Sequence, residues 1–134
     1  MNSFPLKIVT PDGLLFDGYA QELIVRSTTG DIGFMAGHTN CVAPLGMGQA
    51  MVLTETGKRY GACIGGMVSV VNGAVTLVPT TFEWAEDIDL ARAEDSRKRA
   101  EAILQEKSSS ATDIKLAEAR LKRALIRSSV AKQK

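Results

Sequence analysis

The chain has 134 residues, of which 45% are hydrophobic and 23% charged, and its formal net charge is +1. This composition is ordinary for a folded globular protein and argues against disorder. The near-neutral charge gives no reason to expect nucleic acid as a partner. No apolar run approaches the roughly 20 residues that span a bilayer, and the N-terminal residues do not resemble a signal peptide. We therefore expect no direct membrane insertion.

The composition of the chain changes near residue 85. All twelve glycines and all four prolines precede this point. Gly and Pro interrupt regular structure, so their absence from a remainder rich in Ala, Glu, Lys, Arg and Leu favours helix. We therefore expect a β-rich domain of residues 1–85 followed by a helical domain of residues 86–134.

The first domain is predicted to be a β-sandwich of about ten short strands. Asn72-Gly73 is its clearest hairpin turn, because a type I′ turn needs positive φ at both central residues. Gly65-Gly66, inside strand-like sequence, indicates a bulge or a close approach of the backbone. Short apolar segments with strand character cover residues 4–10, 22–26, 32–35, 41–45, 49–53, 59–64, 67–71 and 74–78. This spacing is typical of a sandwich or a flattened barrel.

The second domain is predicted to be an antiparallel two-helix hairpin. Asp87 or Asp89 can cap the first helix, and residues 107–110 form the connection. Ser110 followed by Asp113 is similar to a capping box that opens the second helix. The apolar stripes are thin and rich in alanine: Ala93, Ala100, Ile103 and Leu104 on helix one, and Ile114, Ala117, Leu121, Ala124 and Leu125 on helix two. Such stripes give little stabilisation beyond the entropy cost of ordering the chain, so we expect a movable hairpin.

No catalytic centre is expected. His38 is the only histidine, and Cys41 and Cys63 do not show metal-ligand spacing. The glycines of residues 46–48 do not match a phosphate-binding loop, because no Gly-Lys-Ser/Thr follows. We therefore predict no catalytic residue, no metal and no required cofactor, and interpret the chain as a binding or mechanical part.

The two helices differ in their charges. Helix one offers opposite charges at i,i+4, Glu94 with Lys98 and Asp95 with Arg99. Helix two has six basic residues and no acidic one after Glu118, namely Arg120, Lys122, Arg123, Arg127, Lys132 and Lys134. The arginines lie on one face, which indicates either an external anion or a solvated basic face that favours the helix dipole.

Helix one carries a matching polar face of Asp89, Arg92, Ser96 and Arg99. In an antiparallel hairpin, Asp89 and Arg92 would lie near Arg123 and Arg127. A carboxylate beside several guanidinium groups could accept a hydrogen bond from an adenine amino group while the arginines hold phosphates.

Three segments resemble the epsilon subunits of F-type ATP synthases. Residues 27–38 are similar to the family's glycine, acid, apolar residue and glycine followed by a Pro-Gly-His loop, with Ala36 where proline is common. Residues 65–70 resemble its Gly-Gly strand, and residues 72–77 resemble the strand that follows. The resemblance covers the whole chain.

This resemblance implies a non-catalytic rotor subunit of the central stalk. The sandwich would contact the gamma subunit and the c-ring, with a c-ring-facing loop containing Asp31, Ile32, Gly33 and His38. The hairpin would extend and inhibit ATP hydrolysis, its residues Arg120, Arg123 and Arg127 meeting an acidic segment of a beta subunit. The subunit would be peripheral, on the cytoplasmic side of the cell membrane.

Some family members bind ATP as a regulatory ligand, and the chain matches their pattern. Residues 88–93 fit the motif of Ile or Leu, Asp, two variable residues, Arg and Ala. The full set implied by the resemblance is Glu83, Ile88, Asp89, Arg92, Ala93, Arg99, Arg123 and Arg127. Two other hypotheses stay open: a free-standing ATP sensor without affinity for gamma, and an adaptor whose helices bind a coiled-coil partner.

Overall fold

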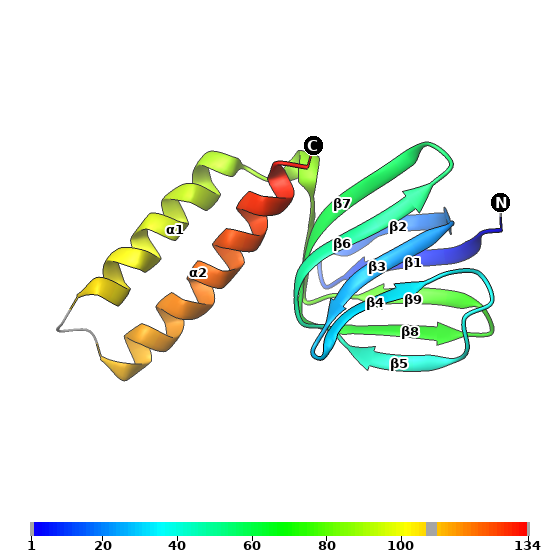
Figure 1. Cartoon of the computed structure of the whole chain (residues 1–134), viewed down its shortest axis with the longest axis horizontal. Coiled ribbons are helices and arrows are strands. Elements are labelled where there is room, and N and C mark those ends of the chain that lie inside the picture. The colour runs from blue at the N-terminus through cyan, green and yellow to red at the C-terminus, as the bar shows by residue number, and fades with distance from the viewer. Residues whose placement is uncertain (1, 107–109, 134) are drawn as a thin grey trace. The chain divides into compact units, whose positions relative to one another are not determined.

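The computed structural model describes residues 2–106 and 110–133 of the chain. The chain divides into two compact units, Met1–Trp84 and Ala85–Lys134. In the described residues, the first unit holds ten strands and the second holds a 3₁₀ helix and two α-helices (Figure 1). The predicted fold class, a β-sandwich followed by a helical hairpin, is confirmed.

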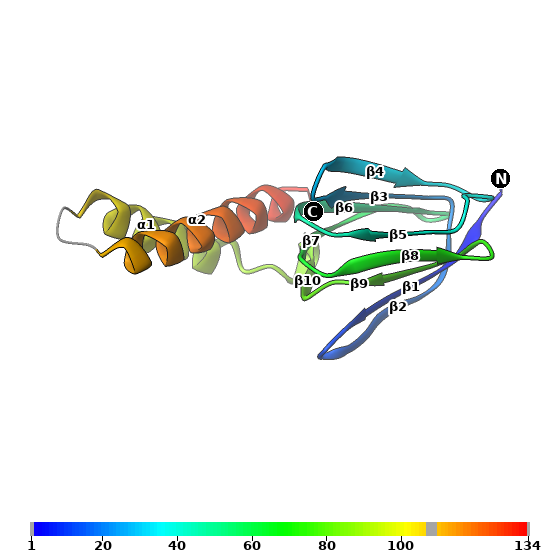
Figure 2. The same ribbon diagram turned by 90° about the horizontal axis from the view of Figure 1, so that it is seen from below.

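Two five-stranded sheets form the layers of the sandwich (Figure 2). The first sheet has the order β2 (Gly13–Ala20), β1 (Phe4–Thr10), β9 (Ala74–Val78), β8 (Met67–Val71) and β5 (Cys41–Pro44). The second has the order β10 (Thr81–Trp84), β7 (Gly57–Ile64), β6 (Met47–Thr54), β3 (Glu22–Ser27) and β4 (Gly30–Phe34). Neighbouring strands pair antiparallel except β1 and β9, which are parallel.

The core lies between the sheets and follows from alternating side chains. In β1, Phe4, Leu6 and Ile8 are buried while the residues between them face outward, as the period of a strand requires. The second sheet contributes Leu23 and Val25 of β3, both fully buried. Burial of such aliphatic side chains contributes about 1.5–3 kcal/mol each, so the sandwich core can stabilise the first unit.

Three hairpin turns of the sandwich share one arrangement. A hydroxyl group donates to the carbonyl of a glycine three residues later and accepts from the backbone N–H two residues later. Each glycine has a positive φ between 121° and 131°. The pairs are Thr10 with Gly13 at 3.4 Å, Ser27 with Gly30 at 2.6 Å, and Thr54 with Gly57 at 3.2 Å.

Two turn predictions are confirmed. Asn72 and Gly73 have φ of 51° and 82° and join β8 to β9, as a type I′ turn requires. Gly66 has a φ of +97°, and a Cβ added there would lie 2.6 Å from Cα of Pro79 and even closer to the carbonyl oxygen of Val78. Only glycine allows this close approach of two backbones.

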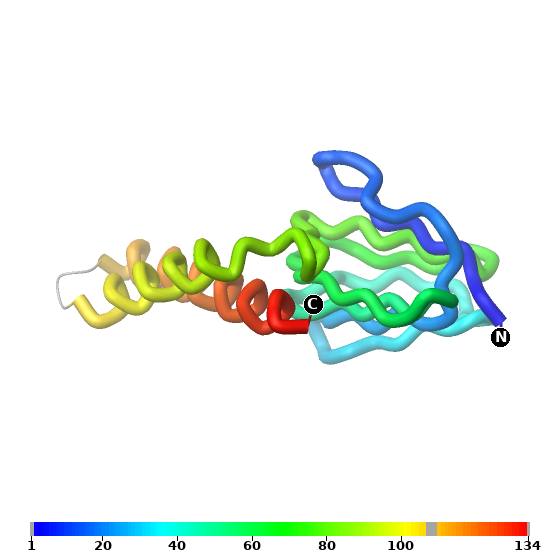
Figure 3. The backbone as a smooth tube through the Cα atoms, turned by 90° about the horizontal axis from the view of Figure 1, so that it is seen from above, coloured from blue at the N-terminus to red at the C-terminus, as the bar shows by residue number. Residues whose placement is uncertain are grey.

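The second unit is the helical hairpin, formed by η1 (Ala85–Asp87), α1 (Leu90–Gln105) and α2 (Ala111–Ala131). Asp89 is the N-cap of α1, and the capping box of Ser110 and Asp113 is present at the start of α2. The helices lie side by side and antiparallel (Figures 1 and 3). Of the predicted connection, residues 107–109 lie outside the described residues.

Alanines form the buried stripes of both helices. Ala93 and Ala100 of α1 and Ala117 and Ala124 of α2 are at most 2% exposed. Leu125, expected on the inner stripe, is 49% exposed, so that assignment is wrong. Leu125 points about 100° away from its buried neighbour Ala124, which places it at the edge of the helix interface. Because alanine buries little area, this interface contributes little stabilisation.

We predict that Gly66→Ala destabilises the sandwich by more than ~2 kcal/mol, because it adds a backbone clash to the strain of positive φ. Gly13→Ala is the matched control, since Gly13 has a φ of +130° but no atom near its Cβ position. Its expected cost is ~1 kcal/mol. Urea unfolding can be followed through Trp84, the only tryptophan, which packs against Phe82 at 4.9 Å. Equal midpoints for the two variants would contradict the steric explanation.

Candidate functional site

The first turn of α1 carries the centre of the predicted nucleotide motif. Oδ1 of Asp89 accepts a hydrogen bond from the backbone N–H of Arg92 at 3.0 Å, so this carboxylate caps the helix. Asp89 is nevertheless exposed and can offer its other oxygen. Ile88 and Ala93, at 2% and 0% exposure, are packed inside. Within the motif, Asp89 and Arg92 are therefore the residues that can reach a ligand.

The arginines of the predicted site lie on both helices of the hairpin. Arg92, Arg99 and Arg123 are exposed, and Arg127 is half-buried. Arg99 forms an ion pair with Asp95 at 2.5 Å, as predicted. Because the helices are antiparallel, the start of α1 lies beside the end of α2 (Figure 3). The fold thus brings the N-terminal part of α1 and the C-terminal part of α2 to the same end of the hairpin.

Glu83 and Arg120 complete the set of predicted charged residues. Glu83 belongs to β10 in the first unit, where it pairs with Ala62 of β7. Arg120 is an exposed residue of α2, three positions before Arg123 and on the same face of the helix. Arg120 and Arg123 therefore form an accessible basic surface on α2.

Glu94 was missed as a cross-helix residue by the sequence interpretation. Its carboxylate pairs with Arg97 at 2.8 Å, not with Lys98 as predicted, and Arg97 also pairs with Glu101 at 2.9 Å. This i,i+3 and i,i+4 bridge holds Arg97 between two acids. Spacing alone could not choose between Arg97 and Lys98 as the partner of Glu94.

The environment of Glu94 couples the two helices. The hydrogen bond from Arg97 lowers the pKa of Glu94, and the Ser128 hydroxyl and the charge of Lys132, both in or next to α2, lower this pKa further. Ser128 is 4% exposed, and in the described part of the chain its oxygen lies outside standard hydrogen-bond geometry. Ser128 therefore makes at most a weak polar contact with Glu94.

The predicted c-ring-facing loop is not one loop. Asp31, Ile32 and Gly33 lie in β4, and only His38 lies in the loop that follows this strand. The antiparallel pairing of β3 with β4, from Arg26 opposite Asp31 to Leu23 opposite Phe34, makes the segment extended. Asp31 lies near the start of β4 and His38 lies beyond its end at Phe34, so the expectation of a single loop is wrong, while the c-ring contact of these residues stays a prediction.

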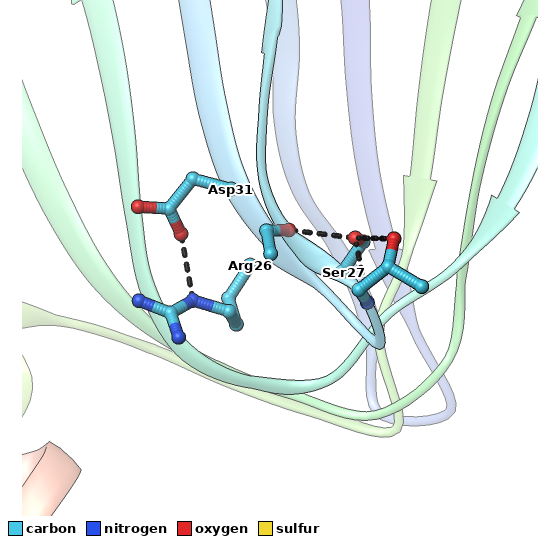
Figure 4. A network of polar contacts seen from close by, with 5 residues as sticks. Arg26, Ser27 and Asp31 are labelled. Atoms are coloured by element: carbon cyan, nitrogen blue, oxygen red, sulfur yellow. Dashed lines mark hydrogen bonds and ion pairs between the residues drawn. The ribbon is translucent and has the colours of Figure 1, made fainter.

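Asp31 is held at the β3–β4 turn by an arginine that the sequence did not single out. Nε of Arg26 donates to Oδ1 of Asp31 at 2.7 Å (Figure 4). The Ser27 hydroxyl donates to the Gly30 carbonyl at 2.6 Å and contacts Thr29 in the same turn. The only sequence signal was the turn itself, which places residues 26 and 31 opposite each other.

The His38 ring contacts neighbouring residues of its own loop and strand. Its Nδ1 lies 2.8 Å from the Thr39 carbonyl, and its ring packs against Phe34 with centroids 4.9 Å apart. Nearby, Oδ1 of Asn40 accepts from the Asn72 N–H at 2.8 Å. These contacts fix the loop between β4 and β5 against the β8–β9 turn.

The described residues offer neither a metal site nor a membrane-spanning helix. Among the described residues, no group of three or more His, Cys, Asp or Glu is placed to hold a metal ion. Both cysteines are free, and burial raises the pKa of Cys63 to about 12, which keeps it a thiol at neutral pH. In the part of the chain that the structure describes, no helix is both long and apolar enough to cross a membrane.

Both units match families of known proteins. Residues 3–85 match the beta-sandwich domain of the ATP synthase delta/epsilon chain, and residues 86–132 match its long alpha-helix domain. The chain therefore belongs to the ATP synthase delta/epsilon family, whose epsilon chain is a non-catalytic subunit of the complex.

Curated relatives define the branch of the family. Proteins named ATP synthase epsilon chain from Ruminococcus albus and Bacillus cytotoxicus are 38% and 37% identical, each over 100% of both chains. The epsilon chain of Macrococcus caseolyticus is 42% identical over 98% of both chains. These matches confirm the resemblance to F-type epsilon subunits.

Solved structures share the fold. A chain in the Euglena gracilis mitochondrial ATP synthase structure of OSCP, F1 and c-ring aligns with a TM-score of 0.83 and 23% identity, over 95% of this chain and 80% of that one. A chain from the central stalk and c-ring of Tetrahymena thermophila mitochondrial ATP synthase aligns with a TM-score of 0.58 and 13% identity, over 95% of both chains.

We predict that Glu94 stabilises the folded hairpin at neutral pH and not in acid. A carboxyl group whose pKa is lowered by folding stabilises the fold above its unfolded pKa of about 4.3, and this contribution is lost as the pH falls through the folded pKa. Glu94→Gln should therefore lower the melting temperature of the helices near pH 7, with the difference from wild type shrinking below about pH 4.

Thermal melts followed by far-ultraviolet circular dichroism measure this difference. Glu118→Gln is the matched control, because Glu118 is an exposed acid of α2. If the difference in melting temperature between wild type and Glu94→Gln grows as the pH falls, ionised Glu94 does not stabilise the hairpin.

Proposed function

We propose that the chain is a central-stalk subunit of the ATP synthase that links gamma to the c-ring and inhibits ATP hydrolysis through its hairpin. The observation that carries this proposal is a hairpin with an alanine-built interface and an exposed basic surface on α2. The sandwich supplies a rigid base, because its core is made of large aliphatic and aromatic side chains.

The small interface supports a change of partners by the helices. Four alanines supply most of the fully buried positions in the middle of α1 and α2, and Leu116 and Leu125 remain 53% and 49% exposed. An extended hairpin loses little buried area and gains the chance to bury these leucines against another subunit. The cost of opening is then small enough for binding elsewhere to offset it.

The basic surface supports the inhibitory contact. Arg120 and Arg123 are exposed on one face of α2, and the helix has no acidic residue beyond Glu118. Guanidinium groups bind carboxylates through paired hydrogen bonds. An acidic helix of the beta subunit is a complementary partner for this surface, with Arg127 at its edge.

ATP is the regulatory ligand proposed for the folded hairpin. Asp89 would accept from the adenine amino group, while Arg92, Arg99, Arg123 and Arg127 would hold the phosphates. Arg99 would have to exchange its ion pair with Asp95 for a phosphate contact. ATP that binds only the folded form stabilises it by RT ln(1 + [L]/Kd), which opposes the inhibitory form.

The location follows from this role. The subunit would be peripheral on the cytoplasmic side of the cell membrane, bound through gamma and the c-ring and requiring no cofactor. A free-standing ATP sensor is the alternative, supported by the same arginines. This alternative predicts that the isolated chain becomes more compact when it binds ATP and that it does not bind gamma.

Removing residues 88–134 is expected to raise ATP hydrolysis by the reassembled enzyme about two- to tenfold, because the inhibitory element is lost. The double variant Arg120→Ala/Arg123→Ala should give part of this rise. Lys115→Ala/Lys122→Ala removes the same charge from exposed positions of α2 and should give none. Steady-state hydrolysis measures the outcome, and equal rates for wild type and the truncated chain would refute the inhibitory role.

ATP binding by the purified full-length chain is expected to weaken at least about tenfold in Arg92→Ala and in Arg127→Ala, since each loses a charge-assisted phosphate contact. Lys98→Ala is the matched control, because Lys98 is an exposed cation of α1. Isothermal titration calorimetry gives the affinities. Unaltered heats in both arginine variants would remove the nucleotide site while leaving the rotor role intact.

A further inference from the structure

The β3–β4 turn carries an ion pair that is more constrained than its exposure would suggest. Arg26 and Asp31 are opposite each other across the strands, and their side chains are 52% and 58% exposed. Ion pairs this exposed contribute about 0–1 kcal/mol to stability. The geometry of the pair therefore needs an explanation other than the stability of the fold.

The aliphatic part of the Arg26 side chain packs against the backbone of two glycines, Gly46 and Gly48. A Cβ added to Gly48 of β6 would lie 2.6 Å from Cβ and 3.1 Å from Cγ of Arg26. A Cβ added to Gly46 would lie 2.9 Å from the Ser27 carbonyl oxygen and 3.5 Å from Cγ of Arg26. Neither glycine has positive φ, so close approach rather than backbone conformation explains both.

The backbone of the same turn is fixed from two sides. The Gly46 N–H donates to the Arg26 carbonyl at 2.9 Å, and the Thr28 N–H donates to the Pro44 carbonyl at 3.3 Å. Ser27 forms a bridge with Leu45, and its hydroxyl closes the turn internally. Residues 44–46 therefore hold the backbone of residues 26–28, and Asp31 lies opposite Arg26 in the paired strand β4.

The pair leaves polar atoms facing outward. Only Nε of Arg26 and Oδ1 of Asp31 take part in the contact (Figure 4). Over residues 2–106 and 110–133, no hydrogen bond uses the two Nη atoms of Arg26 or Oδ2 of Asp31. The turn thus presents a donor edge and an acceptor oxygen side by side, a combination that suits a polar loop with amide or guanidinium groups.

The geometry points to Arg26, seated on Gly48, as the positioning residue that holds Asp31 for contact with the polar loop of the c-ring. This inference rests on the proposed function, which links the sandwich to the c-ring, and on the c-ring contact that the family resemblance implies for Asp31. By holding Asp31 in one orientation before binding, Arg26 reduces the side-chain entropy lost when the contact forms. Gly48 is required because any larger residue would displace the Arg26 stem.

The test uses ATP synthase depleted of this subunit and reassembled with labelled full-length variants. The measured quantity is the dissociation rate of the labelled chain. Arg26→Ala and Asp31→Asn are each expected to increase this rate about three- to tenfold. The double variant is expected to dissociate no faster than Asp31→Asn, because Arg26 acts through Asp31. Gly48→Ala should reproduce the effect of Arg26→Ala, with thermal unfolding confirming that each variant is folded.

Lys58→Ala is the matched control, because it removes an exposed positive charge from the same sheet. An unchanged rate for Asp31→Asn would overturn the proposed c-ring contact of this turn. A faster rate for Asp31→Asn with an unchanged rate for Arg26→Ala would overturn only the positioning role. Additive effects in the double variant would show that Arg26 contacts the partner by itself and would also overturn it.

Discussion

The alanines at the interface between α1 and α2 limit the stability that this interface gives to the folded hairpin. Ala93, Ala100, Ala117 and Ala124 allow the helices to approach closely, but each buries little apolar area. Polar contacts around Glu94 add to this interface near the end of α2. The sandwich, in contrast, has a core of large side chains between two five-stranded sheets. A firm base and a weakly held pair of helices fit the proposed role, in which the hairpin changes partners while the sandwich stays in place.

The same contrast appears in how each unit presents charge. On the sandwich, Arg26 and Asp31 form a pair fixed by backbone and glycine contacts. On the hairpin, Arg120 and Arg123 stand exposed on a helix surface. A fixed pair suits a permanent contact, because little entropy is lost on binding. Exposed arginines on a weakly held helix suit a contact that forms and breaks.

Much of the fold could be predicted because its signals are local. Asn72-Gly73 specifies a type I′ turn, and Ser110 with Asp113 specifies a helix start, through the backbone of a few residues. Strands β2 and β10 were not predicted, and for β2 the reason is that most of its side chains are exposed, which leaves little buried alternation to recognise. The shared hydroxyl–glycine turn was visible as Ser or Thr three residues before Gly, but its role appears only when the hydrogen bonds are seen.

The sequence by itself determined the two-part organisation, the family and the residue types of the two helices, because composition, turn chemistry and motif order are properties of the chain. Tertiary structure decided which side chains meet. It turned Leu125 outward and set Asp31 opposite Arg26 across β3 and β4. It also placed Gly48 beneath Arg26, two residues far apart in the sequence. Such contacts depend on strand register and helix rotation, which the whole fold sets and no local segment encodes.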